Sequence, residues 1–439
     1  MATQEPLRVA LVSLGCPKNL VDSEKILAHL AEGGCLVGAP MDEADVIVVN
    51  TCGFISPAVE ESLEVIAEAV ARKRAGQVRR VVVAGCLVNR NGEALYDLAP
   101  GIDAVVGVND RQEILSAVTG RERLTRVSPC SGETGSDAGR FRLTPRHTAY
   151  LRIAEGCSRK CTFCTIPALR GPFRSKPPGA VREEARELIA DGAVELNVIA
   201  QDTTGYGRDL GGRMSLASLL EDLAGLDGVE WVRLMYAYPQ GLSDELIAVL
   251  ARCEHVVPYV DLPLQHISDG VLKRMGRRVT RARIERLLEE MRRRIDGLAL
   301  RTTFLVGFPG ETDEQFEELL DFVRSTAFSA VGVFCFCAEA GTPAARLDGR
   351  VPPDLARQRR ETIMLAQQEI AFRANEQRVG SPIRVLVDGT DGEGICVGRT
   401  YGQAPDVDSI CKLTEPRPAG SFVDGRVAAC DAYDLIVEV

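Results

Sequence analysis

The stretch Cys157-Ser158-Arg159-Lys160-Cys161-Thr162-Phe163-Cys164 contains three cysteines, spaced C-x3-C-x2-C. Thiolates are soft ligands, so such a group favours zinc, copper(I) or an iron–sulfur centre. A structural zinc site normally has four ligands, and the next residues, 165–167, supply no fourth. A cubane cluster held by three cysteines leaves one iron open to a small molecule. The stretch therefore predicts a reactive iron–sulfur site, with a zinc knuckle or an iron–sulfur electron carrier as the alternatives.

This spacing, with Phe163 in the aromatic position, resembles the signature of the radical S-adenosylmethionine (SAM) enzymes. The resemblance implies that Cys157, Cys161 and Cys164 hold a [4Fe–4S] cluster whose open iron binds SAM. It also implies an electron donor, such as flavodoxin or ferredoxin. Reduction of the cluster then releases a 5′-deoxyadenosyl radical, which abstracts hydrogen from an unactivated carbon.

Length and composition restrict the class of protein. A chain of 439 residues suggests about three domains of roughly 150 residues. The net charge of −10 argues against tight nucleic-acid binding. No apolar run approaches a membrane span, and the first eight residues lack the pattern of a signal peptide, so we expect a cytoplasmic protein without a membrane partner. In that reducing compartment, the 14 cysteines favour metal or redox roles over disulfides.

The expected first domain, residues 1–123, contains three short apolar runs that each lead into a turn with glycine and cysteine: 9–14, 45–49 and 81–84. Helical patterns such as 23–31 and 56–74 separate these runs, which predicts a parallel sheet covered by helices. Ligands bind at the carboxyl ends of the strands in such sheets. We therefore expect a second three-thiolate site, rather than three inert buried cysteines, from Cys16, Cys52 and Cys86. Cys35, at the opposite end of a βαβ unit, is expected to be structural.

The turns resemble the three cysteine motifs of the methylthiotransferases: Ser13-Leu14-Gly15-Cys16-Pro17-Lys18-Asn19, Asn50-Thr51-Cys52-Gly53-Phe54-Ile55 and Gly85-Cys86-Leu87. The resemblance implies an auxiliary [4Fe–4S] cluster on Cys16, Cys52 and Cys86, tied to the sulfur that is inserted, and an external sulfur donor. The Cys-Pro-Lys-Asn form is similar to the RimO-type members, which modify an aspartate of ribosomal protein uS12. The tRNA-modifying members usually carry Cys-Gln-x-Asn there.

Residues 124–147 are polar and turn-rich, and we expect them to form a surface linker in which Cys130 has no partner motif. The next domain, 148–374, contains six apolar runs separated by amphipathic helical patterns: 149–154, 194–200, 231–236, 256–262, 298–306 and 330–336. Six β/α units predict a partial barrel of the TIM type, with reactive residues at the carboxyl ends of its strands. Thr312 and Gln315 form a capping-box pattern at the start of one helix.

Four residues near predicted strand ends are candidates for binding SAM: Phe163, Gln201, Gln265 and Gly307. The amides of Gln201 and Gln265 suit hydrogen bonds to the ribose or carboxylate of SAM, or contacts that tie loops together. Gly307 begins the turn Gly307-Phe308-Pro309-Gly310-Glu311, where glycine permits a close backbone approach. That turn resembles the SAM-contacting turn of radical SAM barrels, although an ordinary βα turn has the same composition. No general acid or base is assigned.

One segment departs from the methylthiotransferase pattern. These enzymes usually carry Tyr-Ser before the Gly-Thr-Pro motif, whereas this chain has Phe336-Cys337. Because strand side chains alternate, Cys335 and Cys337 are expected to share one face as small barrel residues. The alternative is that one of them lies near the clusters. The four histidines show no ligand spacing.

Residues 375–439 contain five short strand-like runs between turns, which predicts a small antiparallel β-barrel. This domain resembles a TRAM domain, which usually binds RNA. It carries 6 Lys and Arg against 11 Asp and Glu, a balance of −5, so it is expected to favour a basic protein over RNA. We expect Asp388, Asp391 and Glu393 to be exposed acids of that surface.

The family resemblance covers nearly the whole chain and implies a methylthiotransferase that adds a methylthio group to the β-carbon of an aspartate in uS12. One alternative is a tRNA methylthiotransferase, which would favour a basic terminal domain and the Cys-Gln motif. The other is an iron–sulfur protein without catalytic activity, which would not cleave SAM.

Overall fold

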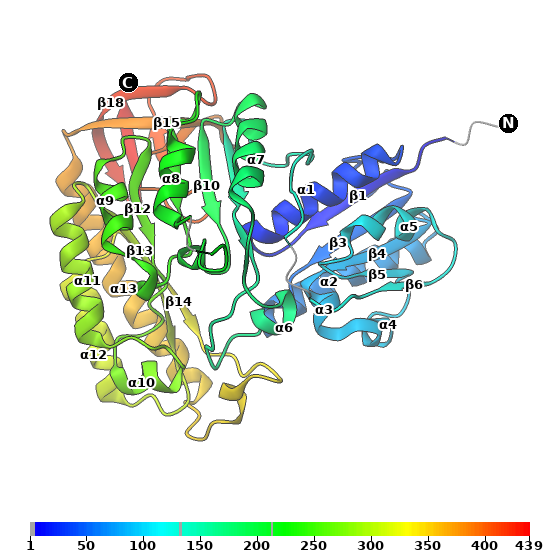
Figure 1. The fold of residues 1–439 in the computed structure, drawn as a ribbon, viewed down its shortest axis with the longest axis horizontal. Coiled ribbons are helices and arrows are strands. Elements are labelled where there is room, and N and C mark those ends of the chain that lie inside the picture. The colour runs from blue at the N-terminus through cyan, green and yellow to red at the C-terminus, as the bar shows by residue number, and fades with distance from the viewer. Residues whose placement is uncertain (1–4, 131–133, 212–213) are drawn as a thin grey trace.

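The computed structural model describes residues 5–130, 134–211 and 214–439, which form three sheet-based units (Figure 1). Residues 1–4 of the expected first domain, 131–133 of the expected linker and 212–213 of the expected barrel lie outside the described residues. In the described part of the chain, no helix is long and apolar enough to cross a membrane.

The N-terminal unit is a six-stranded parallel sheet in the order β2-β1-β3-β4-β5-β6, which confirms the predicted α/β domain. Its strands are β1 (Arg8–Ser13), β2 (Leu36–Val37), β3 (Val46–Thr51), β4 (Arg80–Gly85), β5 (Ala104–Val106) and β6 (Leu124–Arg126). Its helices are α1 (Pro17–Glu32), α2 (Ser56–Arg74), α3 (Cys86–Asn91), α4 (Leu95–Leu98) and α5 (Ile114–Thr119). Strands β3 and β4 are buried throughout because apolar clusters cover both faces of the sheet.

Strand β6 differs from the prediction, because it falls inside the segment expected to be a linker. Its sequence, Leu-Thr-Arg, is too short and too polar to show a strand pattern. Pairing with β5 along the edge of the sheet fixes it in place. The N-terminal sheet therefore extends a few residues beyond 123.

The central unit is a six-stranded parallel sheet in the order β14-β13-β12-β11-β10-β7, as predicted for a partial TIM-type barrel. Its strands are β7 (Thr148–Arg152), β10 (Glu195–Ile199), β11 (Trp231–Leu234), β12 (Val256–Asp261), β13 (Ala299–Val306) and β14 (Ala330–Cys335). The helices are α6 (Ile166–Arg170), α7 (Pro178–Ala190), α8 (Leu216–Ala224), α9 (Asp244–Arg252), α10 (Asp269–Arg274), α11 (Arg281–Arg294), α12 (Asp313–Thr326) and α13 (Pro353–Arg378). A small hairpin, β8 (Ala154–Glu155) with β9 (Arg174–Ser175), frames the cysteine loop. The predicted capping box of Thr312 and Gln315 is present.

The C-terminal unit is a closed five-stranded barrel in the order β15-β16-β17-β19-β18. Its strands are β15 (Pro382–Thr390), β16 (Cys396–Arg399), β17 (Cys411–Leu413), β18 (Phe422–Asp431) and β19 (Asp434–Glu438). The barrel is as predicted except that β17 and β19 pair in parallel. Strand β18 pairs antiparallel with both β15 and β19. Strand β19 lies between β18 and β17 and runs in the same direction as β17.

A buried charge triad joins the C-terminal barrel to the central one. The Glu195 carboxylate of β10 accepts hydrogen bonds from Arg233 of β11 (Nη2–Oε1, 2.9 Å) and Arg399 of β16 (Nη2–Oε2, 2.8 Å). Glu195 and Arg233 have no exposed side-chain surface. Burial alone would raise the pKa of Glu195, but Arg399 and Arg233 outweigh it and lower that pKa to about 2. The terminal barrel therefore closes the amino-terminal end of the central sheet, opposite the strand ends expected to carry the chemistry (Figure 1).

The acids of the terminal domain correct one expectation. Asp388 is not an exposed acid, because its carboxylate binds His147 (Nε2–Oδ1, 2.9 Å) and Arg399 (Nε–Oδ2, 2.8 Å). Asp406 accepts a hydrogen bond from the Tyr150 hydroxyl, and Asp408 accepts one from that of Tyr259. Part of the negative charge thus holds the barrel in place, whereas Glu393 is exposed as predicted.

Replacing Glu195 with glutamine will lower the free energy of unfolding by roughly 3–5 kcal/mol, since the buried Arg233 loses its counter-charge and Arg399 keeps only Asp388. Glu221→Gln is the matched control, because Glu221 pairs with Arg252 on the surface, where the expected loss is at most about 1 kcal/mol. The pKa of Glu195 is depressed in the folded protein, so its contribution is complete above its unfolded value and declines as the pH falls from about 4.5 to about 2. Thermal unfolding of both variants across this range tests the triad, and equal losses in the two would contradict it.

Candidate functional site

The three N-terminal cysteines lie at the carboxyl ends of three adjacent strands. In the sheet, Ser13 of β1 pairs with Asn50 of β3, and Thr51 of β3 pairs with Gly85 of β4. Cys16, Cys52 and Cys86 follow these positions within a few residues. A Cβ atom on Gly15 would lie 3.3 Å from the Cys52 Sγ, and one on Gly53 would lie 2.7 Å from the Cys86 carbonyl oxygen. The structure thus brings the three turns together, and their glycines are needed for that approach.

Burial and one arginine define the environment of these thiols. Burial raises the pKa of Cys52, and it raises that of Cys86 to about 12, although Arg170 acts in the opposite direction. The Arg170 Nε lies 3.2 Å from the Cys86 Sγ, and its Nη2 lies 3.3 Å from the Asn19 Oδ1. Cys35 lies in the core at the other end of the unit, as expected for a structural residue.

The radical SAM motif forms the loop that follows β7 and the short strand β8. The backbone N–H of Cys157 donates to the Gly171 carbonyl (3.1 Å), and that of Cys164 donates to the Cys161 carbonyl (3.2 Å). Burial raises the pKa of Cys157 to about 11 and that of Cys164 to about 12. The Arg277 guanidinium lies 4.0 Å from the Cys161 Sγ.

The predicted SAM-binding residues lie around the same strand ends. The Gln201 Nε2 donates to Glu155 (2.5 Å), and its buried Oε1 has no partner among the described residues. Gln265 has φ of 72°, a strained conformation for a residue other than glycine, and its backbone pairs with β13. The Phe163 ring packs edge-to-face against Phe308, with centroids 6.4 Å apart.

The structure gives a packing reason for glycine at position 307. Its φ is 73°, which favours glycine, but a Cβ atom there would lie 2.6 Å from the Ala356 Cβ of α13. The close approach that requires glycine is thus made by a helix of this chain. The Gly307 backbone belongs to the turn after β13, as expected from the sequence.

Several contacts hold the N-terminal cysteine turns against the mouth of the central barrel. The Thr165 hydroxyl, next to Cys164, donates to the Phe54 carbonyl (3.0 Å). The Lys18 Nζ lies 3.2 Å above the ring of Tyr236, a second strand-end residue with positive φ (58°). The buried carboxylate of Glu339 accepts hydrogen bonds from the Ser56 N–H and the Arg90 guanidinium, both 2.6 Å. The two cysteine sets therefore belong to facing edges of two units (Figure 1).

A buried charge network, absent from the sequence prediction, supports this junction. Asp22 of α1 binds Arg170 (Nη1–Oδ2, 2.8 Å) and Arg152 (Nη1–Oδ1, 2.7 Å), and also Arg111. Burial would raise the pKa of Asp22, but these arginines lower it to about 2. Arg152 also binds Asp137 (2.6 Å), from the segment expected to be a linker. The charged residues of this network lie far apart in the sequence and form no motif. The sequence alone therefore could not predict that they pair.

Cys335, Cys337 and Cys130 take places outside the two sets. Strand β14 ends at Cys335, which packs beside the core of the central barrel, and Cys337 follows in the loop toward Glu339. The Cys130 Sγ lies 3.1 Å from the Leu169 carbonyl oxygen and 3.4 Å from the Asn89 Nδ2. It therefore packs between α3 and α6, close to Cys86.

The donor sets fit cubane clusters better than single ions. Among the described residues, no group of three or more His, Cys, Asp and Glu side chains is arranged around one metal ion. A cubane does not need that arrangement, because each cysteine binds a different iron. Four of the six thiols have a pKa raised by burial. Bound iron would compensate the thiolate charge in these buried positions.

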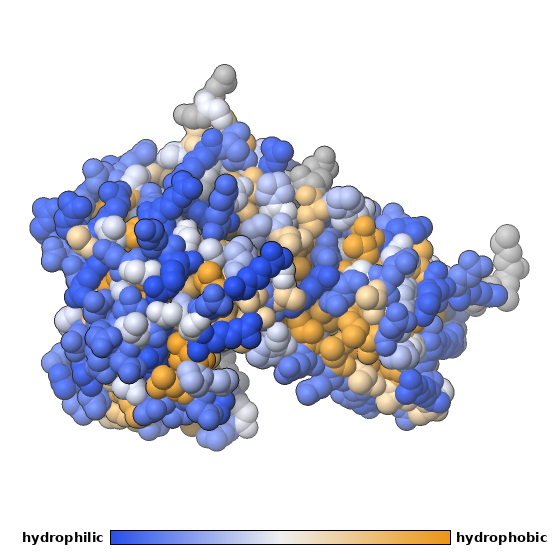
Figure 2. All heavy atoms as spheres, turned by 90° about the horizontal axis from the view of Figure 1, so that it is seen from below, coloured by the Kyte–Doolittle hydropathy of each residue, from blue (hydrophilic) through white to orange (hydrophobic). Residues whose placement is uncertain are grey.

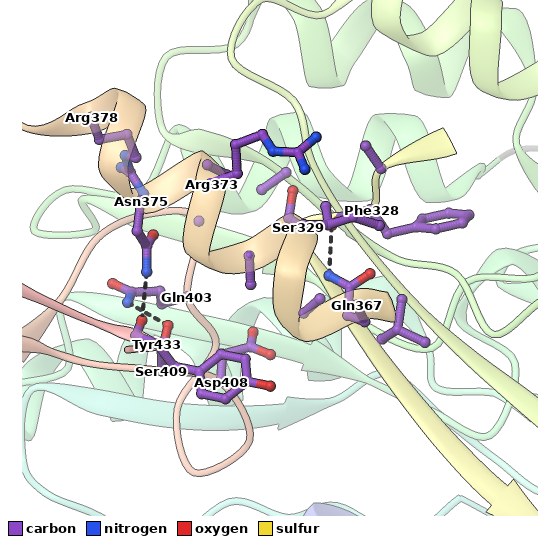
Figure 3. A pocket seen from close by; sticks show the side chains of 18 of the residues that line it. Phe328, Ser329, Gln367, Arg373, Asn375, Arg378, Gln403, Asp408, Ser409 and Tyr433 are labelled. Carbon is purple, nitrogen blue, oxygen red and sulfur yellow. Dashed lines mark hydrogen bonds between the residues drawn. The ribbon is translucent and has the colours of Figure 1, made fainter. Parts of the chain in front are cut away.

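A large cavity lies away from this site. It measures about 750 Å³ and lies at the amino-terminal end of the central sheet, between α13 and the terminal barrel (Figure 3). Arg373, Asn375 and Gln367 of α13 line it, and the Asn375 amide donates to the Tyr433 carbonyl (3.0 Å). Seen from below the view of Figure 1, apolar side chains gather on the N-terminal unit beside a hollow next to the central barrel (Figure 2). This cavity therefore does not coincide with the two cysteine sets.

Three family models match successive parts of the chain. Residues 8–107 match "Uncharacterized protein family UPF0004", residues 151–323 match "Radical SAM superfamily", and residues 379–439 match "TRAM domain". The first match covers the turns of Cys16, Cys52 and Cys86, and the second covers Cys157, Cys161 and Cys164. Both cysteine sets thus fall within family models.

Solved structures with the same arrangement are distant in sequence. The radical S-adenosylmethionine methyltransferase TsrM from Kitasatospora setae, with tryptophan and a SAM analogue bound, has a TM-score of 0.58 and 17% identity over 85% of this chain and 91% of its own. The structure of TsrM with cobalamin and a [4Fe–4S] cluster bound has a TM-score of 0.54 and 19% identity over 77% of each chain. At this identity they support the fold alone.

Curated relatives are similar over the full length. Proteins named ribosomal protein uS12 methylthiotransferase RimO are 44% identical in Geotalea uraniireducens, over all of both chains, and 46% identical in Pelotomaculum thermopropionicum, over 98% of this chain and 99% of that one. The Clostridioides difficile relative of that name is 40% identical over 99% of both. The chain therefore belongs to the RimO family of radical SAM methylthiotransferases, whose cofactors are SAM and two [4Fe–4S] clusters.

Proposed function

We propose that this chain adds a methylthio group to the β-carbon of an aspartate in ribosomal protein uS12. The observation that carries the proposal is an identity of 40–46% over nearly the whole chain to relatives named for this substrate. In this reaction the aspartate loses one hydrogen from the β-carbon and gains the methylthio group there. The enzyme would act in the cytoplasm, where uS12 is made, with an electron donor and a sulfur donor as further partners.

We assign the two cysteine sets to different tasks. Cys157, Cys161 and Cys164 would hold the cluster that binds SAM, whereas Cys16, Cys52 and Cys86 would hold the auxiliary cluster. When bound, the SAM cluster supplies the radical and the auxiliary cluster supplies the place for sulfur. The chain holds the two sets on facing edges, supported by the buried network of Asp22, Arg152 and Arg170.

Four residues would hold SAM at the barrel mouth. Gln201 offers a buried amide oxygen without a partner, which suits a donor such as the SAM amino group or ribose. The side chain of Gln265, whose backbone is held in a strained conformation, and the backbone of Gly307 would also contact SAM. Phe163 would fix the loop by packing on Phe308. We propose domain boundaries near those expected from sequence, with the first boundary moved to follow β6 at Arg126.

The terminal domain favours a basic protein over tRNA. Its balance of −5 opposes a phosphate backbone, and Glu393, Glu415 and Asp424 are exposed. A ribosomal protein is generally basic because it binds RNA. The motif at Cys16 also argues against the tRNA alternative, since Cys16 precedes proline and lysine instead of glutamine.

In cells that lack this protein, mass spectrometry will show uS12 without the methylthio group, while methylthiolated tRNA nucleosides remain unchanged. Restoring the wild-type gene will restore the modification, and a gene with Cys157→Ala will not, because the SAM cluster is lost. The proposal is wrong if uS12 is modified normally in the deletion strain, and loss of a tRNA modification would favour the alternative.

A further inference from the structure

A basic hollow lies beside the radical SAM loop, on the carboxyl-terminal side of the central sheet. It measures about 500 Å³, and the cationic residues that line it are Lys160, Lys273, Arg277 and Arg278. Lys160, Lys273 and Arg278 are exposed, and none of the three forms an ion pair with the residues that the structure describes. The single acid of the lining, Asp269, accepts a hydrogen bond from the Arg281 N–H (2.6 Å) and so caps α11. The lining of the hollow therefore carries four positive charges against one negative charge.

The wall of this basic hollow is in contact with the cysteine loop. A Cβ atom on Gly276 would lie 2.4 Å from the Lys160 carbonyl oxygen, and the Thr162 N–H donates to the Met275 carbonyl (2.9 Å). These contacts flank Cys161 on both sides. Arg277, only 6% exposed, reaches Cys161 with one nitrogen, while its Nε has no partner among the described residues. A protein bound here would contact residues that adjoin the cluster ligand Cys161 in the chain.

We propose that the basic hollow is the docking site for a small acidic electron-carrier protein of the flavodoxin or ferredoxin class. This inference rests on the proposed function, because the cluster of Cys157, Cys161 and Cys164 must gain one electron before SAM is cleaved. The carrier loses that electron and no covalent bond changes in the transfer. Positive charge beside the entry point speeds the encounter with an acidic carrier, and a small polar interface suits a partner that must leave after each transfer.

The charge of the basic hollow distinguishes this partner from the substrate. A basic ribosomal protein would be repelled by Lys160, Lys273 and Arg278, and the exposed acids of the terminal domain lie at the other end of the central sheet. RNA is the competing anionic ligand. An electron carrier is favoured because the hollow adjoins a cluster ligand and because the proposed substrate is a protein and not RNA.

The test uses the reconstituted enzyme with Lys273→Glu and Arg278→Glu combined. Arg324→Glu with Arg373→Glu is the matched control, since both arginines line the cavity at the opposite end of the barrel. Calorimetry would measure binding of a bacterial flavodoxin and of a bacterial ferredoxin at low and high salt, and stopped-flow absorbance would follow cluster reduction. We expect the first variant to bind at least one carrier roughly tenfold more weakly and to be reduced more slowly by it. Dithionite should reduce the first variant as fast as it reduces the wild type. The control variant should bind the carriers and be reduced by them as the wild type is.

Three results would overturn the docking site: carrier binding and reduction that the first variant leaves unchanged, an equal loss in the control, or no binding of either carrier to the wild type. A loss confined to a short RNA stem-loop would assign the basic hollow to phosphate binding instead. If dithionite-reduced wild type forms no 5′-deoxyadenosine, the proposed function fails, and that outcome is separate from the docking result.

Discussion

Replacing Cys157, Cys161 and Cys164 together with alanine will abolish SAM cleavage and remove roughly half of the iron and sulfide from anaerobically reconstituted protein. The reason is that the two cysteine sets lie on separate units, the first on the loop after β8 and the second at the ends of β1, β3 and β4. Each set would hold its own cluster, so one can be lost alone. Iron and sulfide analysis with an assay for 5′-deoxyadenosine measures both effects.

The matched control replaces Cys35, Cys253 and Cys430, three cysteines outside both sets, with alanine. This variant should keep its iron and its SAM cleavage. A triple variant at Cys157, Cys161 and Cys164 that lost all of its iron, or none of it, would contradict two independent clusters.

Replacing Cys52 with alanine will have the opposite pattern, with 5′-deoxyadenosine formed and no methylthiolated uS12 produced. Cys52 lies outside the central barrel, and its turn packs against Gly15 and Ser62 of the N-terminal unit. The SAM loop is therefore left intact. Alanine is smaller than cysteine, so the close contact with Gly15 creates no clash. Chromatography of the nucleoside and mass spectrometry of uS12, run on the same reaction, separate the two activities.

Cys35→Ala in the same unit is the control for that experiment and should retain both activities. Full methylthiolation by the Cys52 variant would remove Cys52 from the auxiliary site. Loss of 5′-deoxyadenosine in the Cys52 variant alone would show that the N-terminal cysteines support the radical step instead.

The strands could be predicted from the sequence where it contains a continuous apolar run. Strands β3, β4 and the six central strands each contain a short apolar run that is buried in the fold, and their predicted bounds differ from the observed ones by only a few residues. The cysteine edge was predictable because each cysteine follows such a strand. Strand β6 was not, since three edge residues carry no periodic pattern.

Long-range charge pairing explains the remaining differences. Asp388 was expected to be an exposed acid, but its carboxylate binds Arg399 and also His147, which lies 241 positions earlier in the chain, so it is only partly exposed. Asp22 and Arg170 likewise meet only because α1 and α6 come together at the junction of two units. Gly307 shows the same limit, because its packing against Ala356 depends on a helix that starts far along the chain.

The most direct measurement uses uS12 deuterated at the β-carbon of its aspartates, incubated with the reconstituted wild-type protein, SAM and a reductant. The proposed function predicts that deuterium appears in 5′-deoxyadenosine and that uS12 gains one methylthio group with the loss of one β-deuterium. A tRNA anticodon stem-loop in place of uS12 should remain unmodified. Formation of 5′-deoxyadenosine without deuterium and without modified uS12, or modification of the stem-loop, would contradict the assignment of this chain to the aspartate of uS12.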